Sequence, residues 1–158
     1  MNLLRGAKDH FLDRLAATLV RRGAPQMATA LLDQPRVFGP QERLHVAKTA
    51  VVNNAFFNTT SGDITVDEWG MISHGACLLT GYHDVTELNR DRQVTAPFYG
   101  CDITVGQGAW LATNVIVLGP CAIGEHAVVA AGTLVRHDVA PYMIVAGAQA
   151  RIIGEIPH

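Results

Sequence analysis

The sequence predicts an all-β fold, a left-handed parallel β-helix of about five coils with a short N-terminal helical segment and a projecting loop. Three features support this fold. An aliphatic residue recurs every six positions, at Val105, Leu111, Val117, Ile123, Val129 and Val135. A small or compact residue follows each of them four positions later, at Ala109, Val115, Cys121, Ala127, Thr133 and Val139. Glycines fall where turns would be needed, at Gly106, Gly119, Gly124 and Gly132.

A six-residue period fits neither the turn of an α-helix nor the two-residue alternation of an open strand. We interpret each hexamer as a short strand plus a turn, with three hexamers in one coil. The aliphatic side chain would then point into a three-sided prism, and the compact one would lie at its corner. Since parallel crossovers are normally right-handed, the repeat alone justifies a left-handed coil.

Composition limits the classes of function. The chain has 158 residues, of which 49% are hydrophobic and 16% charged, so it can bury a core. Its net charge is -2 without a basic block, which argues against a nucleic-acid partner. No apolar run is long enough to span a bilayer, and the charged N-terminus is unlike a secretory signal, so we expect no membrane partner. Three cysteines without metal-type spacing predict reduced thiols in a cytoplasmic protein.

The first segment, residues 1–36, is predicted to form a helical cap. Apolar residues recur at helical spacing between residues 3 and 22, at Leu4, Ala7, Phe11, Leu15 and Leu19. A second short helix is expected to begin at Pro25 and continue through Met27, Ala30 and Leu31. Such a segment would cover the open end of the β-helix, where unpaired strand edges invite association. A lid over a substrate is the alternative role.

The β-helix domain is predicted over residues 37–158. Its six-residue phase begins with Val46 and Val52, breaks at Asn58 and resumes at Val66. Val66 follows Val52 by fourteen residues, two more than two hexamers. We therefore expect a two-residue bulge at one corner of the prism.

Two segments of this domain depart from the repeat. Residues 81–100 are polar, charged and free of the period, so we expect them to leave the prism as a loop. Loops on a rigid scaffold are where binding and chemistry often reside. The C-terminal tail, residues 141–158, is expected to pack along the outside of the last coil.

The repeat and its ending, VAAGTLVRHDVAPYMIVAGAQARII, resemble the hexapeptide-repeat acyltransferases, in particular the sugar O-acetyltransferases for galactosides, maltose and capsular sugars. The resemblance covers about Leu44 to Ile153. A second motif, Tyr82-His83-Asp84 followed by a charged loop and GQGAWLATN, is the part closest to activity. The resemblance implies an acetyl-CoA-dependent O-acetyltransferase acting on a sugar or another hydroxyl-bearing small molecule. It also implies a homotrimer in which neighbouring subunits share each site.

By this resemblance, His83 is the candidate catalytic base. Acyl transfer to an alcohol needs a group that takes the hydroxyl proton, and an imidazole can do so near neutral pH. Asp84 or Glu87 would orient the ring, and Asp84 is also a candidate for acceptor binding. The alternative is that His83 is an ordinary loop histidine in solvent.

The resemblance also implies residues that contact coenzyme A. These are Trp110, Ala112, Thr113, Ala131, Arg136, His137 and Arg151. Small side chains leave room for an extended pantetheine arm, and arginines suit the phosphates. Two departures stand out, because Arg136-His137 replaces the family's Thr-Lys pair and Ala148-Gln149 replaces its Asn-Pro pair. The alternative is that these residues serve only as repeat units.

For the acceptor, the candidates are Asn53, Asn58 and Ser61, since amides and hydroxyls bind hydroxyl-rich molecules. Ser61 stands where the family has an acidic residue, which leaves the class of acceptor open. The alternative is that the asparagines fill left-handed turn conformations.

Two other functions must be weighed. Some left-handed β-helices serve as non-catalytic scaffold subunits, which would keep the repeat without the site. The γ-type carbonic anhydrases share the fold but bind zinc through three histidines, two of them five residues apart. This chain has no such HxxxxH pair, so we expect no metal.

Overall fold

A computed structural model gives the fold and describes residues 2–27 and 33–158. The chain divides into two compact units, Met1–Gln34 and Pro35–His158.

The first unit contains α1 (Asn2–Arg21), the long helix that the apolar spacing predicts. Gly23, with a φ of 78°, follows its end in the left-handed conformation that often terminates helices. Residues 25–27 are also helical, whereas Ala30 and Leu31 of the predicted second helix lie outside the described residues. The cap role of this unit stays a prediction. In the described part of the chain, no helix combines the length and the apolar character of a membrane span.

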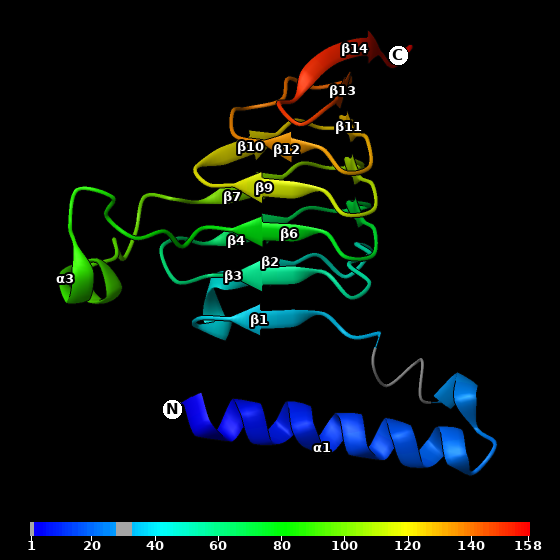
Figure 1. The fold of residues 1–158 in the computed structure, drawn as a ribbon. Helices are drawn as coiled ribbons and strands as arrows, with labels where there is room; N and C mark the ends of the chain where they lie inside the picture. Colours follow the sequence, from blue (N-terminus) through cyan, green and yellow to red (C-terminus); the bar gives the residue numbers. More distant parts are fainter. Residues whose placement is uncertain (1, 28–32) are drawn as a thin grey trace. The chain divides into compact units, whose positions relative to one another are not determined.

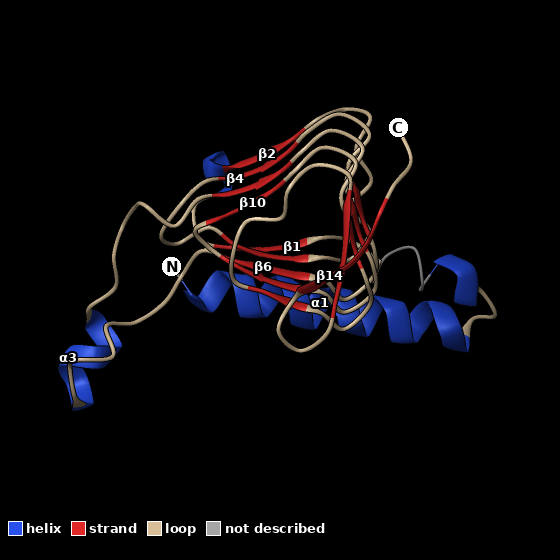
Figure 2. Ribbon diagram, turned by 90° about the horizontal axis from the view of Figure 1, so that it is seen from above, coloured by secondary structure: helices blue, strands red, loops and turns tan. Residues whose placement is uncertain are grey.

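The second unit is a prism whose three walls are sheets of mainly parallel strands (Figures 1 and 2). Sheet A contains β1 (Arg36–Phe38), β3 (Phe56–Asn58), β6 (Cys77–Leu79), β9 (Ile116–Leu118) and β12 (Leu134–Val135). Sheet B contains β2 (Leu44–Val46), β4 (Ile64–Val66), β7 (Ile103–Val105) and β10 (Cys121–Ile123). Sheet C contains β5 (Met71–Ile72), β8 (Trp110–Leu111), β11 (Val128–Val129), β13 (Met143–Ala146) and β14 (Arg151–Glu155). The chain winds from A to B to C, and a short 3-10 helix, η1 (Gln41–Arg43), precedes β2.

Successive coils stack in register, so the recurring aliphatic side chains form the interior. In sheet A, Val117 pairs with Leu78 of the preceding coil and Val135 of the following one. The six predicted aliphatic residues are at most 1% exposed, and the six compact ones at most 5%. Each fully buried aliphatic side chain stabilises the fold by about 1.5–3 kcal/mol relative to an exposed one. The predicted inward positions are confirmed.

The phase of the early coils differs from the prediction. The interior residue of β3 is Phe57, which is fully buried and pairs with Leu78, while Asn58 lies on the outer face. Phe57 follows Val52 by five residues, and Val66 follows Phe57 by nine. The prediction of a single two-residue bulge is therefore wrong. The spacing from Val52 to Phe57 is one residue shorter than a hexamer, and the spacing from Phe57 to Val66 is three residues longer. Strand pairing decides the register, and the aromatic ring takes the interior position.

The tail also differs from the prediction. Strand β13 is a further rung of the prism, because Val145 is buried and pairs with Val129, sixteen residues earlier rather than eighteen. The coil is two residues shorter at the corner between Val135 and Val139, which are four residues apart rather than six. Only after β13 does the chain leave the repeat, and β14 then pairs with β13 in the antiparallel direction.

Two corners of the prism matter for the site. The AB corner, between sheets A and B, consists of residues 39–43, 59–63, 80–102, 119–120 and 136–138. The CA corner, between sheets C and A, consists of residues 53–55, 73–76, 112–115 and 130–133. The predicted loop, residues 81–100, leaves from the AB corner, carries α3 (Asn89–Val94) and extends away from the walls (Figures 1 and 2).

Candidate active site

The loop begins in a tight place at the AB corner. A Cβ atom on Gly81 would collide with the Thr60 hydroxyl and lie 2.8 Å from the Asn58 amide, so only glycine fits there. The Asn58 side-chain oxygen accepts hydrogen bonds from the Thr60 backbone N–H (3.0 Å) and hydroxyl (2.7 Å). The predicted acceptor residue Asn58 therefore lies at the root of the loop that carries His83, where it shapes the corner.

His83 is exposed, and its two neighbours are held. The Tyr82 hydroxyl lies near the Cys101 thiol, directly after the loop, and this thiol raises the pKa of Tyr82. The Asp84 N–H donates to the Thr95 carbonyl oxygen (3.4 Å). Within the described residues, the His83 ring has no hydrogen bond or ion pair. Its backbone is thus fixed on both sides while its imidazole remains available to solvent.

Asp84 does not orient the His83 ring in this structure. Its Oδ1 accepts hydrogen bonds from the Thr86 N–H (2.8 Å) and the Thr86 hydroxyl (2.6 Å). These bonds hold the pKa of the Asp84 carboxyl below its ordinary value. At neutral pH this places a carboxylate directly beside His83 in the chain.

A groove of about 840 Å³ runs along the AB corner beside the loop root. Its walls include both predicted and unpredicted residues: Leu79, Gly81, Tyr82, Asp102, Thr104, Leu118, Gly119, Pro120, Cys121, Ala122, Arg136, His137 and Asp138. A second hollow, of about 530 Å³, is lined by Arg136, His137 and Arg151 among others. The structure thus brings three of the predicted carrier residues together, and it brings two of them to the groove at the root of the His83 loop.

The other predicted carrier residues lie elsewhere on the prism. Thr113 and Ala131 are exposed at the CA corner, and Ala112 beside them is buried. Trp110 lies on the outer face of sheet C, where its indole N–H donates to the Ser73 hydroxyl (3.1 Å). Sheet A therefore separates the predicted carrier residues into two groups.

The predicted acceptor residues are separated in the same way. Asn53 lies at the CA corner with a φ of 40°, and its side-chain amide donates to the Ile72 carbonyl oxygen (2.7 Å). This is the left-handed turn conformation of the alternative interpretation. Ser61 lies at the AB corner but is fully buried, and its hydroxyl has no hydrogen-bond partner among the described residues.

Sequence reasoning missed the polar framework of the AB corner. Asp102 Oδ1 accepts a hydrogen bond from the Asp63 N–H, and Asp138 Oδ1 accepts one from the Ala122 N–H, both at 2.8 Å. Arg43 contacts the returning leg of the loop. A signal was present, because Asp63, Asp102 and Asp138 each directly precede an inward residue of sheet B. In the described part of the chain, no three His, Cys, Asp or Glu side chains are grouped to hold a metal ion.

The three thiols should differ in reactivity. Burial raises the pKa of Cys121 to about 12, with Asp138 adding to the effect, and burial also raises the pKa of Cys101. Cys77 is half-buried on the outer face of sheet A. Because the thiolate is the reactive form, we expect Cys101 and Cys121 to react slowly with Ellman's reagent at pH 8, and Cys77 to react quickly wherever the outer face of sheet A is uncovered. All three should react in denaturant, and two fast thiols in the folded protein would contradict the described burial.

Comparisons with known proteins agree with this architecture. Residues 102–137 match the family described as "Bacterial transferase hexapeptide (six repeats)". The chain is 28% identical over 131 residues to galactoside O-acetyltransferase of Escherichia coli, covering 80% of this chain and 61% of that protein. It is 30% identical over 141 residues to serine acetyltransferase 2 of Arabidopsis thaliana, covering 89% of this chain and 40% of that protein. The chain thus spans less than two thirds of these relatives.

A solved structure gives the same result for the fold. The chain superposes on a galactoside acetyltransferase in complex with coenzyme A with a TM-score of 0.66 at 19% identity, covering 92% of this chain and 81% of that one. At this identity the likeness concerns the fold. With the repeat match and the relatives above, it confirms the resemblance inferred from the sequence: the chain contains a hexapeptide repeat, has the left-handed β-helix fold and is similar in sequence to acetyltransferases.

Proposed function

We propose that this protein is an acetyl-CoA-dependent O-acetyltransferase acting on a sugar or another hydroxyl-bearing small molecule, with His83 as general base. The observation that carries the proposal is that the loop bearing His83 begins at the groove lined by Arg136 and His137. The named activity of the relatives supports the same reaction class.

In the proposed reaction, the His83 imidazole takes the proton of the acceptor hydroxyl while the hydroxyl oxygen bonds to the thioester carbonyl carbon. The resulting oxyanion collapses, the carbon–sulfur bond breaks, and the coenzyme A thiolate receives the proton from His83. Arg136 and Arg151 would bind the phosphates of the carrier, since a guanidinium suits phosphate geometry. Thr113 and Ala131 would flank the pantetheine arm. No covalent enzyme intermediate is needed.

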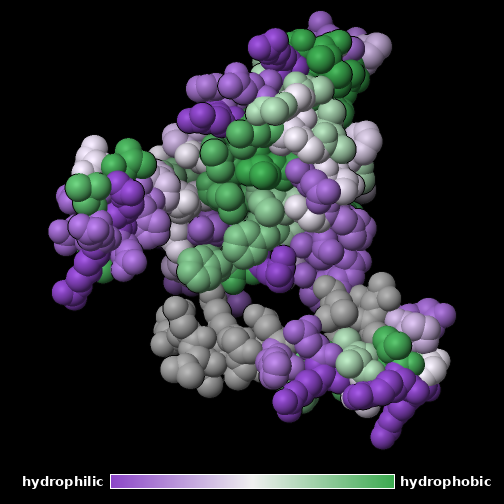
Figure 3. Space-filling model, viewed as in Figure 1, coloured by the Kyte–Doolittle hydropathy of each residue, from purple (hydrophilic) through white to green (hydrophobic). Residues whose placement is uncertain are grey.

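A single chain leaves this site incomplete, because the His83 loop and the Thr113 segment lie at opposite edges of sheet A. The outer face of sheet A is largely apolar, and Figure 3 shows this as the green surface over the walls. It carries Phe38, Phe56, Cys77, Leu79, Ile116, Leu118 and Leu134. The loop exposes further apolar side chains, at Val85, Leu88, Val94, Phe98 and Tyr99. Contiguous apolar surface of this kind marks an interaction site.

We propose that these surfaces are covered by two further copies in a homotrimer. Sheet C also presents an apolar outer ladder, formed by Val51, Met71, Trp110, Val128 and Ile144. The outer ladder of sheet B is more polar, formed by His45, Thr65, Thr104 and Ala122. Packing of sheet A on the sheet C side of the next copy would give a closed cyclic assembly. The 81–100 loop of one subunit would then have to reach residues 110–113 of its neighbour, and we expect it to do so.

The assembly makes a testable prediction. Light scattering is expected to give a mass of about three times 17.0 kDa. Ile116→Asp, which puts a charge on the outer face of sheet A, should give a folded monomer with little activity. Thr65→Asp, a matched change on the outer face of sheet B, should remain trimeric. A wild-type monomer that is fully active at nanomolar concentration would contradict a shared site.

The proposed activity is tested by thiol release from acetyl-CoA in the presence of a panel of sugars and hydroxyl amino acids. We expect turnover that requires a hydroxyl acceptor and stops when His83 is replaced. The 30% identity to a serine acetyltransferase favours serine as a second candidate acceptor. Turnover with serine and none of the sugars would support that candidate. No acceptor-dependent release from any member of the panel would count against the proposed function.

A further inference from the structure

We propose that Arg43 is a positioning residue, which fixes the returning leg of the 81–100 loop to the prism and so holds His83 in one working arrangement. This inference rests on the proposed function only for its effect on catalysis. The structural part of it concerns the loop alone.

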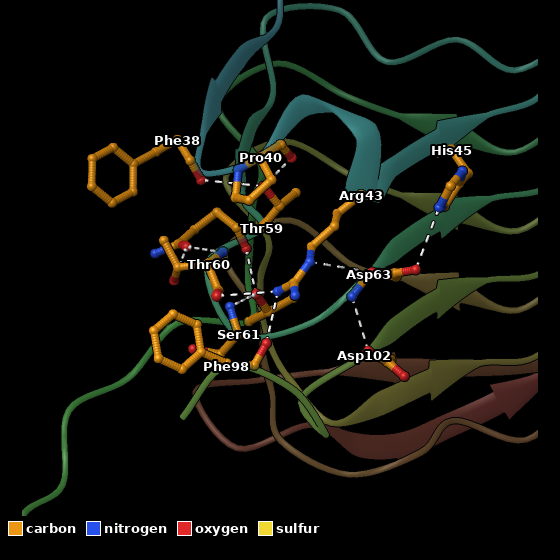
Figure 4. Close-up of polar contacts among 12 residues, drawn as sticks. Phe38, Pro40, Arg43, His45, Thr59, Thr60, Ser61, Asp63, Phe98 and Asp102 are labelled. Carbon is orange, nitrogen blue, oxygen red and sulfur yellow. Dashed lines mark hydrogen bonds and ion pairs between the residues drawn. The ribbon is translucent and has the colours of Figure 1, made fainter. Parts of the chain in front are cut away.

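The Arg43 guanidinium joins three separate segments (Figure 4). Its Nη1 donates hydrogen bonds to the Phe98 carbonyl oxygen (2.7 Å) and to the Thr60 carbonyl oxygen (3.2 Å). Its Nε lies 3.8 Å from Asp63 Oδ1. The Arg43 side chain is 25% exposed, so the charge is partly shielded from solvent. One side chain thus links the root of β2, the long corner before β4 and the end of the loop.

The bond to Phe98 is the anchor of the loop segment. Within the described part of the chain, residues 83–99 make no other hydrogen bond to the prism. Side-chain packing within the chain does not replace it at this point, because Phe98 and Tyr99 are 71% and 79% exposed in the single chain. The other bonds of the segment are internal, such as those from Arg92 to the Glu87 and Val85 carbonyl oxygens. The segment is folded on itself and fastened at Arg43.

The anchor is connected to the wall of the groove. Asp63, the carboxylate beside Arg43, donates its own N–H to Asp102 Oδ1 (2.8 Å), and Asp102 lines the groove at the AB corner. Asp63 Oδ2 also lies 3.5 Å from His45 Nε2, on the outer face of sheet B. The contacts therefore run from the loop through Arg43 and Asp63 to the groove. A shift of the loop against the groove would move His83 relative to a bound acceptor.

An arginine suits this position for a physical reason. Its planar guanidinium presents several donors in a fixed geometry, so one group can serve two carbonyl oxygens and still face a carboxylate. A lysine ammonium keeps the charge but is a flexible point donor. A glutamine has neither the charge nor the reach to all three partners.

The test compares Arg43→Gln and Arg43→Lys with Arg90→Gln, the same change at an exposed loop arginine. The first readout is backbone amide hydrogen exchange of residues 81–100, measured without any substrate. We expect about tenfold faster exchange in Arg43→Gln, an intermediate rate in Arg43→Lys and no change in Arg90→Gln. Wild-type exchange in folded Arg43→Gln would overturn the proposal. If Arg43→Gln does not fold, wild-type exchange in Arg43→Lys would overturn it.

The second readout is kinetic. In Arg43→Gln we expect kcat to fall about tenfold, because a small misplacement of a base is costly, while KM for acetyl-CoA changes less than twofold. A raised KM with an unchanged kcat would overturn the positioning role. If the wild-type protein shows no acetyl transfer, the proposed function fails, while the exchange rates still decide whether Arg43 anchors the loop.

Discussion

Val117→Asp is expected to unfold the second unit. Val117 is fully buried on the inner face of sheet A, between Leu78 and Val135 of the adjacent coils. The interior column holds no cation among its described members that would pair with a carboxylate. Leaving an uncompensated charge in such a place costs at least about 3–5 kcal/mol, a large part of the total stability of a typical domain. Thermal melting followed by circular dichroism measures the effect.

The matched control is Gln107→Asp. Gln107 is exposed at a turn of the same repeat, and surface changes away from special features usually stay within about 0.5 kcal/mol. Each variant adds one negative charge. The new carboxylate faces the interior in Val117→Asp and the solvent in Gln107→Asp. Equal melting temperatures would contradict the register and the interior that it defines.

His83→Ala is expected to lower acetyl transfer by on the order of a hundredfold or more, which is the usual contribution of a general base. The fold should persist, because the His83 side chain is exposed and its ring makes no hydrogen bond in the described structure. Binding of acetyl-CoA should also persist, since Arg136 and Arg151 remain in place. Steady-state kinetics and calorimetric titration with coenzyme A separate the two effects.

The control for this change is His10→Ala, at an exposed position on α1. It removes an imidazole from the other unit and should leave turnover unchanged. Near wild-type turnover of His83→Ala would remove His83 from the role of base. Loss of coenzyme A binding in His83→Ala would instead indicate that His83 contacts coenzyme A.

The interior of the prism could be predicted because a strict period is a property of the chain alone. Each hexamer repeats the same steric demand, so Val105 and its successors reveal the inward direction without any knowledge of partners. The phase around Phe57 and Val145 could not be obtained in this way. There, corner lengths change, and the hydrogen-bonded register with the neighbouring coil decides which residue turns inward. A count along the sequence does not contain that pairing.

The candidate site was predictable in part for the same reason. Tyr82, His83 and Asp84 are adjacent in sequence, so their shared place on the loop follows directly. Arg43 and Asp63 act through contacts with segments distant in sequence, and no local pattern singles out Arg43. The position of Asn53 shows the opposite problem. Its residue type fits both a ligand and a left-handed turn, and only the backbone angle and the bond to Ile72 reveal the turn.

The reversed strand β14 has a consequence for how copies can line up along the prism axis. Stacked parallel coils offer unpaired backbone groups at their last rung, and an identical coil could extend them into a fibre. Here β14 runs against β13, and the segment before it covers the last strand of sheet A, with hydrogen bonds from Leu134 to Gly147 and from Ala150 to Leu134. At this end of the prism, sheets A and C therefore present a hydrogen-bonding pattern that does not match an incoming parallel coil. We expect this mismatch to disfavour lengthwise polymerisation at this end of the prism.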